Sequence, residues 1–288
     1  MDRSSADNWV TGWVASDAPQ IGFAFVRRDA DGWQEGPRPG LRSIELDLTA
    51  ASEGNFSAHR VQTVPDSMPA DTDWFCHDGD FDFIYVVSGS IAIETEDGEH
   101  YTLGPGASAI HPARTWRREY DASPDLEYLR VTVPAELPTI VGRLSALPPR
   151  EGTRSPQQDP VYTFDLPENY VVAAGPRRFF EYRDLETAAF TDGRIHIHVV
   201  HAVESGTSTG WHYHSMAQWF LILEGNADIE VEDKPTFQMG PLDSMCIGRG
   251  MRHDVARFSG DYKLIEMCVP ADYETVGVEP PDRSSVGR

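Results

Sequence analysis

Hydrophobic and polar positions alternate along many short stretches of the chain, between turns rich in glycine and proline. Residues 83–87 and 90–95 are two such stretches. Side chains on a strand point alternately to its two faces, so this alternation predicts β-strands with one buried face. The 21 prolines and 24 glycines among 288 residues supply the turns that such strands need. The pattern predicts an all-β fold.

The second half of the chain repeats the first. Residues 86–89 (Val-Val-Ser-Gly) match residues 222–225 (Ile-Leu-Glu-Gly), and the Val-Pro pair at 133–134 matches the pair at 269–270. Across all matches the offset stays between 136 and 139 residues. A repeat this long indicates two copies of one domain rather than a solenoid. We therefore expect two tandem jelly-roll barrels.

The composition between the two copies sets the domain limits. We expect an N-terminal arm packing on a barrel, a first barrel, a linker, a second barrel and a tail, at residues 1–40, 41–136, 137–175, 176–272 and 273–288. The arm has one strand candidate at residues 21–26. Residues 138–147 could form a short helix, stopped by the two prolines that follow. The last eight residues are expected to be mobile.

Three histidines and one glutamine stand at fixed spacings in the second barrel. His212 and His214 are two residues apart, so both point to one face of a strand, and Gln218 shares their parity. His253 arrives from a second strand far along the chain. Imidazoles that converge from two strands inside a small barrel can bind a divalent transition metal. We therefore predict a metal site at His212, His214, Gln218 and His253.

This stretch resembles the two motifs of the cupin superfamily. The first motif is matched at His212, His214 and Gly225, with Gln218 at the position of the family's glutamate. The second is matched at Gly240, Gly250 and His253, with Gly248 where proline is usual. The resemblance implies a bicupin, that is, two tandem cupin jelly-roll (double-stranded β-helix) barrels with a few short helices. It does not by itself name a reaction, because one fold hosts many functions.

The internal repeat tests the metal hypothesis within one sequence. The positions of His212, His214, Gln218 and His253 correspond in the first barrel to Phe75, His77, Asp82 and Arg117. Two of three imidazoles are missing there, and an arginine cation opposes a dication. We expect an empty first barrel that covers the second barrel or builds the oligomer. The alternative is that it binds an organic anion through Arg114 or Arg117.

The glutamine changes the electrostatics of the predicted site. Three histidines and a glutamate would leave one net positive charge on a divalent metal, whereas three histidines and Gln218 leave two. Such a site should prefer an anionic oxygen donor such as an enolate, phenolate or carboxylate. Gln218 could ligate through its amide oxygen or hold a neighbouring ligand. A catalytic base must then come from elsewhere or be a metal-bound hydroxide.

Other candidate residues lie on strands near the motif. His196 and His198 alternate on a strand before it, and we name His198 as a candidate acid, base or substrate donor. Packed or surface histidines are the alternative. Glu266 lies in a strand-forming stretch and is interpreted as an edge or rim residue.

Composition limits the partners. The formal net charge of −22 disfavours nucleic acid and anionic lipid. There is no apolar signal segment and no 18-residue apolar run, so we expect a cytoplasmic protein. The three cysteines form no paired pattern, which favours reduced, buried thiols. A small, anionic substrate is the expected partner, and exposed edge strands favour a homodimer.

Three functional hypotheses follow. The first is an Fe(II) dioxygenase, similar to quercetinase-like and diketone-cleaving cupins, which cleaves a C–C bond of a small enol, phenol or carboxylate substrate. The second is a metal-dependent isomerase or decarboxylase in which the metal is a Lewis acid. The third is a non-catalytic cupin that binds a small ligand. We expect one divalent transition metal per chain, with Fe(II) favoured and Zn, Ni or Mn as alternatives.

Overall fold

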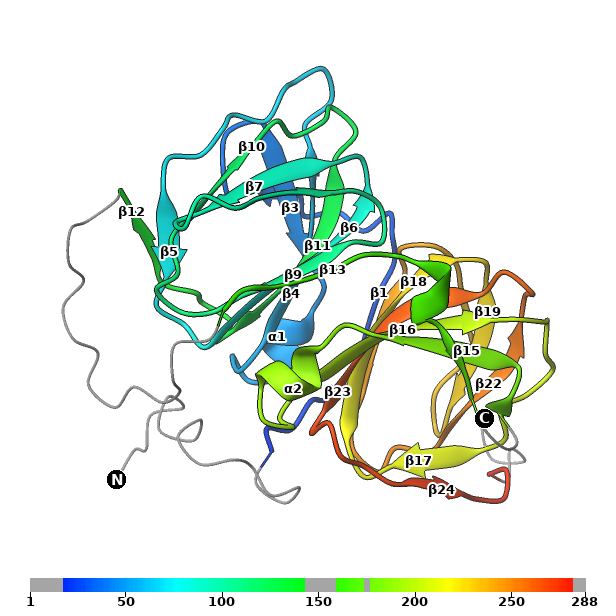
Figure 1. Ribbon diagram of the computed structural model, residues 1–288. Helices are drawn as coiled ribbons and strands as arrows, with labels where there is room; N and C mark the ends of the chain where they lie inside the picture. The colour runs from blue at the N-terminus through cyan, green and yellow to red at the C-terminus, as the bar shows by residue number, and fades with distance from the viewer. Residues whose placement is uncertain (1–17, 143–158, 174–176, 282–288) are drawn as a thin grey trace. The chain divides into compact units, whose positions relative to one another are not determined.

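The structure is a computed structural model, and it describes residues 18–142, 159–173 and 177–281. The chain divides into two compact units, each described here by itself (Figure 1). The described residues of the first unit lie within 31–165, and those of the second within 18–30 and 166–281. Both units consist of two antiparallel sheets, and the described helices are short. The predicted all-β fold with two jelly-roll barrels is confirmed.

The N-terminal barrel consists of a seven-stranded and a five-stranded sheet. The seven-stranded sheet has the order β13 (Val161–Thr163), β9 (Ser108–His111), β6 (Phe81–Ser88), β11 (Glu127–Val133), β4 (Ser57–Thr63), β3 (Leu41–Glu45), β2 (Gln34–Glu35). The five-stranded sheet has the order β12 (Thr139–Val141), β5 (Phe75–His77), β10 (Arg117–Tyr120), β7 (Ile91–Thr95), β8 (His100–Leu103). Helix α1 (Leu48–Ala51) connects β3 to β4.

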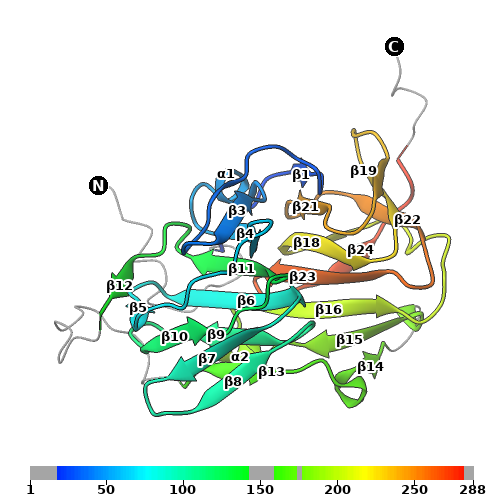
Figure 2. The ribbon, with the colours of Figure 1, turned by 90° about the horizontal axis from the view of Figure 1, so that it is seen from above.

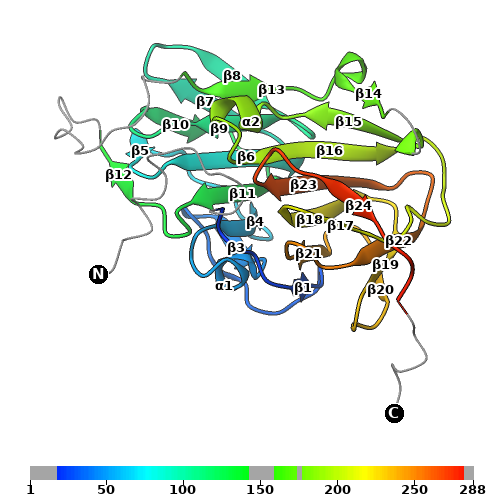
Figure 3. The ribbon, with the colours of Figure 1, turned by 90° about the horizontal axis from the view of Figure 1, so that it is seen from below.

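The C-terminal barrel repeats this plan. Its seven-stranded sheet has the order β1 (Ala24–Val26), β21 (Ser244–Ile247), β18 (Ala217–Glu224), β23 (Lys263–Val269), β16 (His196–Ala202), β15 (Phe180–Asp184), β14 (Val171–Val172). Figure 3 shows the part of this order that runs from β18 to β14. The five-stranded sheet has the order β20 (Phe237–Met239), β19 (Ala227–Val231), β22 (His253–Phe258), β17 (His212–His214), β24 (Thr275–Gly277). The short helices are α2 (Thr187–Phe190) and the 3₁₀ turn η2 (Pro167–Asn169).

Each barrel takes an edge strand from outside its repeated segment. In the C-terminal barrel β1 pairs with β21, so the strand candidate of the N-terminal arm is formed over Ala24–Val26 (Figure 2). In the N-terminal barrel β13, from the predicted linker, pairs with β9. The change from one unit to the next therefore falls between Asp165 and Leu166, inside the segment expected to be a linker.

The helix predicted for residues 138–147 is wrong in its described part. Thr139–Val141 form strand β12, which pairs with β5. Three consecutive β-branched side chains lose rotamer freedom in a helix and fit a strand edge better. Residues 143–147 lie outside the described residues.

The segment expected to be a C-terminal tail begins with a strand. Thr275–Gly277 form β24, which pairs with β17 along its length (Figure 1). The pairing satisfies backbone groups of β17 that would otherwise form an open sheet edge. Most of the expected mobile end, residues 282–288, lies outside the described residues.

A core of aliphatic and aromatic side chains fills each barrel. In the N-terminal barrel it includes Ile84, Val86 and Leu103, and in the C-terminal barrel Phe220, Ile222 and Phe258. The predicted burial of the three cysteines as free thiols is confirmed. Among the described residues, no helix combines the length and apolar character needed to cross a membrane.

Candidate metal centre

Three imidazoles meet inside the C-terminal barrel. His212 and His214 point to the same side of β17, and His253 lies directly opposite His212 where β22 pairs with β17. The three ring centroids are 4.3 to 5.2 Å apart. One ring nitrogen from each histidine lies within 4.8 Å of those of the other two. The three histidines therefore form a group that can hold a metal ion, as strand parity predicted.

Each imidazole is anchored through its Nδ1 atom. Nδ1–H of His212 donates to the carbonyl oxygen of Gly210 at 2.6 Å, and Nδ1–H of His253 donates to that of Met251 at 2.9 Å. Nδ1 of His214 lies 2.8 Å from the hydroxyl of Thr275 on β24. A carbonyl can only accept, so His212 and His253 carry their proton on Nδ1 and leave Nε2 unprotonated. This is the tautomer that a metal ligand needs.

Burial keeps these imidazoles neutral. It is the largest influence on all three, and it lowers the pKa of His212, that of His214 to about 4 and that of His253 to about 3. Neutral imidazole is the form that binds metal, so the set needs no proton release at neutral pH. The tautomers and the charge state both fit a divalent transition metal.

Gln218 lies beside these histidines. It comes from β18 and is buried, and its amide nitrogen donates to Nε2 of His253 at 3.3 Å. The amide therefore contacts the nitrogen lone pair that a metal would use. Parity along one strand does not place it, because Gln218 lies in the seven-stranded sheet and His212 and His214 lie in the five-stranded sheet. Ligation by its oxygen stays a prediction.

An aspartate next to His253 holds the loop before β17. Oδ1 of Asp254 accepts hydrogen bonds from the backbone N–H and the hydroxyl of Thr209, both at 3.0 Å, and Oδ2 accepts one from the Ser208 hydroxyl at 2.7 Å. The same Ser208 hydroxyl accepts from the N–H of Gly210. Asp254 thereby fixes the carbonyl that orients His212. No sequence pattern suggested this role.

A small cavity of about 70 Å³ adjoins the three histidines. Most of its wall is apolar, with Phe180, Phe220 and Ile247 among the lining residues. Besides the histidines and Gln218, its polar lining includes Arg177 and Glu266. Sequence reasoning missed Arg177, which lies at the start of the segment expected to be the second barrel.

Glu266 lies in this cavity wall, so its interpretation as an edge or rim residue was wrong. Its strand, β23, is paired on both sides, by β16 and β18. Nε2 of His198 lies 3.0 Å from Oε2 of Glu266. Burial, the largest single influence, would raise the pKa of Glu266, but His198, His214 and Arg177 together outweigh it and lower that pKa to about 2. Glu266 is therefore a carboxylate at physiological pH.

His198 lies behind Glu266 rather than among the residues that line the cavity. It is buried and stands directly opposite Glu266 across the β16–β23 pair. His198, Glu266 and Cys268 also form a second group with potential ligand atoms close together. Burial raises the pKa of Cys268 well above its usual value, and a protonated thiol is a poor ligand. The candidate catalytic role of His198 stays a prediction.

The matching positions of the N-terminal barrel hold ion pairs. Asp82 binds Arg117 and, at 2.8 Å, the Nε of Arg130. Nε2–H of His77 donates to the carbonyl oxygen of His111 at 2.9 Å, so this nitrogen is not available as a lone-pair donor. Arg117 lies opposite Phe75 in the register that pairs His253 with His212. This register confirms the correspondence that the sequence repeat predicted, namely Phe75 with His212 and Arg117 with His253.

Comparison with known protein families gives one match. The family described as the cupin domain matches residues 66–125 and 199–269, one stretch in each unit. Among curated proteins, no sequence match was found.

Several solved structures have the same fold. Protein Ylba from E. coli is similar with a TM-score of 0.61 and 14% identity, covering 96% of this chain and 100% of that chain. Oxalate decarboxylase from Bacillus subtilis, whose structure was studied for its Mn(II) centres, has a TM-score of 0.58 and 13% identity, covering 96% and 86%. A putative glyoxylate-induced protein from Pseudomonas aeruginosa has a TM-score of 0.61 and 12% identity, covering 94% and 96%. Identities this low carry the fold and nothing finer.

Proposed function

Because this chain belongs to the cupin superfamily and carries two cupin domains, we propose that its C-terminal barrel is a metal-dependent catalytic site for a small, oxygen-rich carboxylate. The observation that carries the proposal is the anchoring of His212, His214 and His253 through Nδ1, which leaves Nε2 of His212 and Nε2 of His253 unprotonated beside the third imidazole. Gln218 would complete the ligand set. Imidazole ligands suit iron, nickel, copper and zinc, and Fe(II) is the ion we favour.

The charges around the site favour an anionic substrate. A bound divalent ion supplies Lewis acidity, which stabilises negative charge on a chelating oxygen. Three neutral imidazoles and an amide leave both positive charges of that ion uncompensated, and the opposite charges of Arg177 and Glu266 in the cavity wall offset each other. A carboxylate next to a carbonyl or hydroxyl oxygen could chelate the ion and lie beside Arg177.

The cavity limits the size of the substrate. Its 70 Å³ correspond to roughly two water molecules, which suits an acid of a few carbon atoms. The first form of the proposal is a redox-neutral reaction, an isomerisation or a decarboxylation, in which the metal would act as a Lewis acid.

Glu266 would act on the substrate's hydroxyl group. Its carboxylate can accept a hydrogen bond from that hydroxyl, and His198 at 3.0 Å would hold the carboxylate in place. A carboxyl with a pKa of about 2 is a weak base, so it would orient the substrate and stabilise positive charge more than retain a proton. His198 is then a positioning residue.

The second candidate is the Fe(II) dioxygenase that cleaves a C–C bond. The ligand set supports it, because three neutral imidazoles with open positions suit Fe(II). In this version Glu266 would accept a hydrogen bond from an enol, and the substrate would be oxidised by dioxygen supplied from solution.

One assay separates the two candidates. The metal-loaded protein is incubated with a panel of two- to five-carbon keto and hydroxy acids, in air and under strict anaerobiosis, and products and oxygen consumption are followed. Turnover that persists without oxygen supports the redox-neutral reaction; turnover that stops, with matching oxygen uptake in air, supports the dioxygenase. Glu266→Gln should abolish either turnover while retaining the metal. A wild type that binds metal but converts none of these acids in either atmosphere contradicts the proposal.

A further inference from the structure

The N-terminal barrel contains a cavity of about 280 Å³, roughly the volume of nine water molecules. Its lining includes Arg38, Phe75, Ile84, Glu119, Tyr128 and Arg130. In the strand register, Phe75 and Ile84 hold the positions of His212 and Phe220 in the other barrel. The cavity is thus the counterpart of the pocket beside the three histidines.

The charge of the two pockets is reversed at one corresponding position. Arg130 lies opposite Ile84 and His59, as Glu266 lies opposite Phe220 and His198. A guanidinium therefore lines the N-terminal cavity where a carboxylate lines the other.

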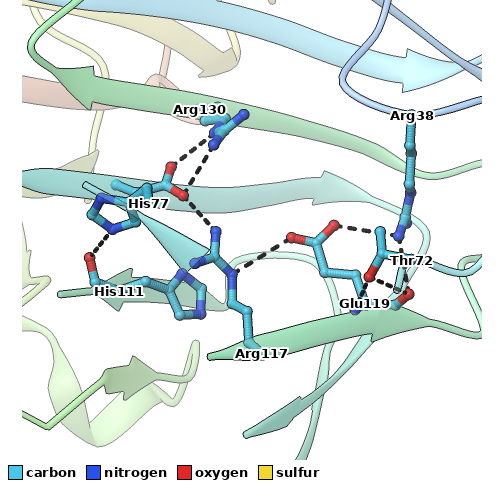
Figure 4. A network of polar contacts seen from close by, with 8 residues as sticks. Arg38, Thr72, His77, His111, Arg117, Glu119 and Arg130 are labelled. Atoms are coloured by element: carbon cyan, nitrogen blue, oxygen red, sulfur yellow. Dashed lines mark hydrogen bonds and ion pairs between the residues drawn. The ribbon is translucent and has the colours of Figure 1, made fainter. Parts of the chain in front are cut away.

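Guanidinium groups outnumber carboxylates in the polar network beside this cavity, and two of the three, those of Arg38 and Arg117, are buried. Figure 4 shows Arg38, Glu119, Arg117 and Arg130 in one polar network. Arg117 and Arg130 bind Asp82, and Nη1 of Arg38 lies 3.3 Å from Oε2 of Glu119. Three guanidinium groups thus face two carboxylates. Burial lowers the pKa of the neighbouring His77 and His111, which leaves them neutral. The interior carries an excess of one positive charge.

Arg38 has N–H donors that make no hydrogen bond among the described residues. Its side chain is 5% exposed and lines the cavity, and its Nε and Nη2 atoms have no hydrogen-bond partner among residues 18–142, 159–173 and 177–281. Buried donors without partners are costly, and a guanidinium offers them in the flat fork that matches a carboxylate.

The remaining wall is largely apolar. Phe75, Ile84, Tyr128 and Val141 line it, and burial raises the pKa of Tyr128, so its ring stays uncharged. The lining aspartates are exposed and already accept hydrogen bonds: Asp73 from the N–H of Trp74 and Asp71 from that of Asp121. Water screens these two charges, whereas the charges of the buried Arg38 and Arg117 are screened much less.

We propose that the N-terminal barrel binds a small monocarboxylate with an apolar body, whose carboxylate pairs with Arg38. One negative charge balances the excess of one positive charge, whereas a dianion such as phosphate would overcompensate it. The apolar wall would contact the body of the ligand. This site needs no metal and is separate from the reaction proposed for the C-terminal barrel.

The test uses benzoate as the probe, on His253→Ala protein kept in a chelator, because a carboxylate would also bind a metal in the C-terminal barrel. Thermal unfolding and calorimetric titration are followed with benzoate, with the uncharged isostere benzamide and with inorganic phosphate. We expect benzoate to raise Tm and to bind with a measurable Kd, and neither benzamide nor phosphate to do so. Arg38→Met should weaken benzoate binding at least about tenfold, the loss of one charge-assisted pair.

Arg118→Met is the matched control. Arg118 follows Arg117 on β10 but is exposed, so its removal takes away the same charge without touching the cavity. Benzoate affinity should be unchanged there. If Arg38→Met fails to fold, the Glu119→Gln variant tests the proposal instead. Glu119 competes with the ligand for Arg38, so its neutralisation should tighten benzoate binding about threefold or more. Equal shifts with benzoate and benzamide, a response to phosphate alone, unaltered binding in Arg38→Met, or unchanged or weaker binding in Glu119→Gln would each overturn the proposal.

Discussion

His253 lies directly opposite His212 in the antiparallel pairing of β22 with β17. The same register in the N-terminal barrel pairs Arg117 with Phe75. Two copies of one fold therefore present different chemistry at equivalent points: neutral imidazoles in one, a buried guanidinium held by Asp82 in the other. The fold fixes where polar side chains can meet inside a barrel, and the sequence of each copy decides what they can bind.

Removing one imidazole should abolish metal binding. Wild type purified without added metal should contain close to one equivalent of a divalent transition metal, and His253→Ala should contain none, because two imidazoles and an amide make a poor site. Elemental analysis measures this directly. Bound metal should also stabilise the wild type by about 2.7 kcal/mol at a hundredfold excess over Kd.

His201→Ala is the control for this prediction. His201 lies on β16, half-buried and paired with Glu181, away from the cavity lining. His201→Ala should contain as much metal as wild type. If His253→Ala also contains as much metal as wild type, the assignment of the site is contradicted.

Replacing Gln218 by glutamate should tighten metal binding. A carboxylate beside Nε2 of His253 would offset one of the two uncompensated charges on the metal, and we expect about a tenfold gain in affinity, or about 1.4 kcal/mol. Competition with a chromogenic chelator measures the change. Gln238→Glu adds the same charge at an exposed position of β20 and should leave affinity unchanged. An equal gain in both variants would show a general charge effect and no ligand role for Gln218.

Asp254→Ala should weaken metal binding without removing a ligand. The carboxylate holds Ser208 and Thr209, and through them the Gly210 carbonyl that orients His212. Loss of such a supporting group costs 10- to 100-fold in metal affinity in comparable sites. Asp228→Ala removes an aspartate of β19 that pairs with exposed Arg257, and is the control. If both variants bind metal as tightly as wild type, the hydrogen bonds of Asp254 to Ser208 and Thr209 do not contribute to metal affinity.

The sequence predicted the three histidines and Gln218 because they lie on three strands of one repeat. Strand parity gave the direction of His212 and His214, and the first barrel supplied the corresponding positions for comparison. Glu266 could not be placed in this way, since whether it lies at an edge or in the centre depends on the order β16-β23-β18. Strand order is set by contacts between distant segments, which periodicity does not report.

The same limit applies to residues from outside the repeats. Thr275 anchors His214 from a strand expected to be tail, and Arg38 lines the N-terminal cavity from the segment expected to be an arm. Both segments are short and show weak periodicity. Their conformation is determined by the parts of the barrel that they contact: the edge of β17 for Thr275 and the cavity wall for Arg38. Their roles depend on tertiary packing that overrides local propensity.

The N-terminal barrel should lose stability as pH falls below about 6.5, the ordinary pKa of histidine. Burial and the charge of Arg117 hold the pKa of His111 well below that value, and neither ring nitrogen has a hydrogen-bond partner among the described residues. The unfolded chain therefore binds a proton that the folded chain does not, so acid favours unfolding. Going from pH 7.5 to 5.5 should cost about 1.4 kcal/mol through His111 alone.

His111→Phe should remove this part of the pH dependence. Urea unfolding of both proteins, followed by tryptophan fluorescence at pH 7.5 and 5.5, gives the free energy of unfolding at each pH. We expect the loss on acidification to be about 1.4 kcal/mol smaller in the variant, because phenylalanine has no group to protonate in the unfolded chain. His100→Phe, which removes an exposed histidine of β8, should keep the wild-type dependence. An equal loss in wild type and His111→Phe would mean that His111 is protonated within the folded barrel, beside Asp82 and despite Arg117.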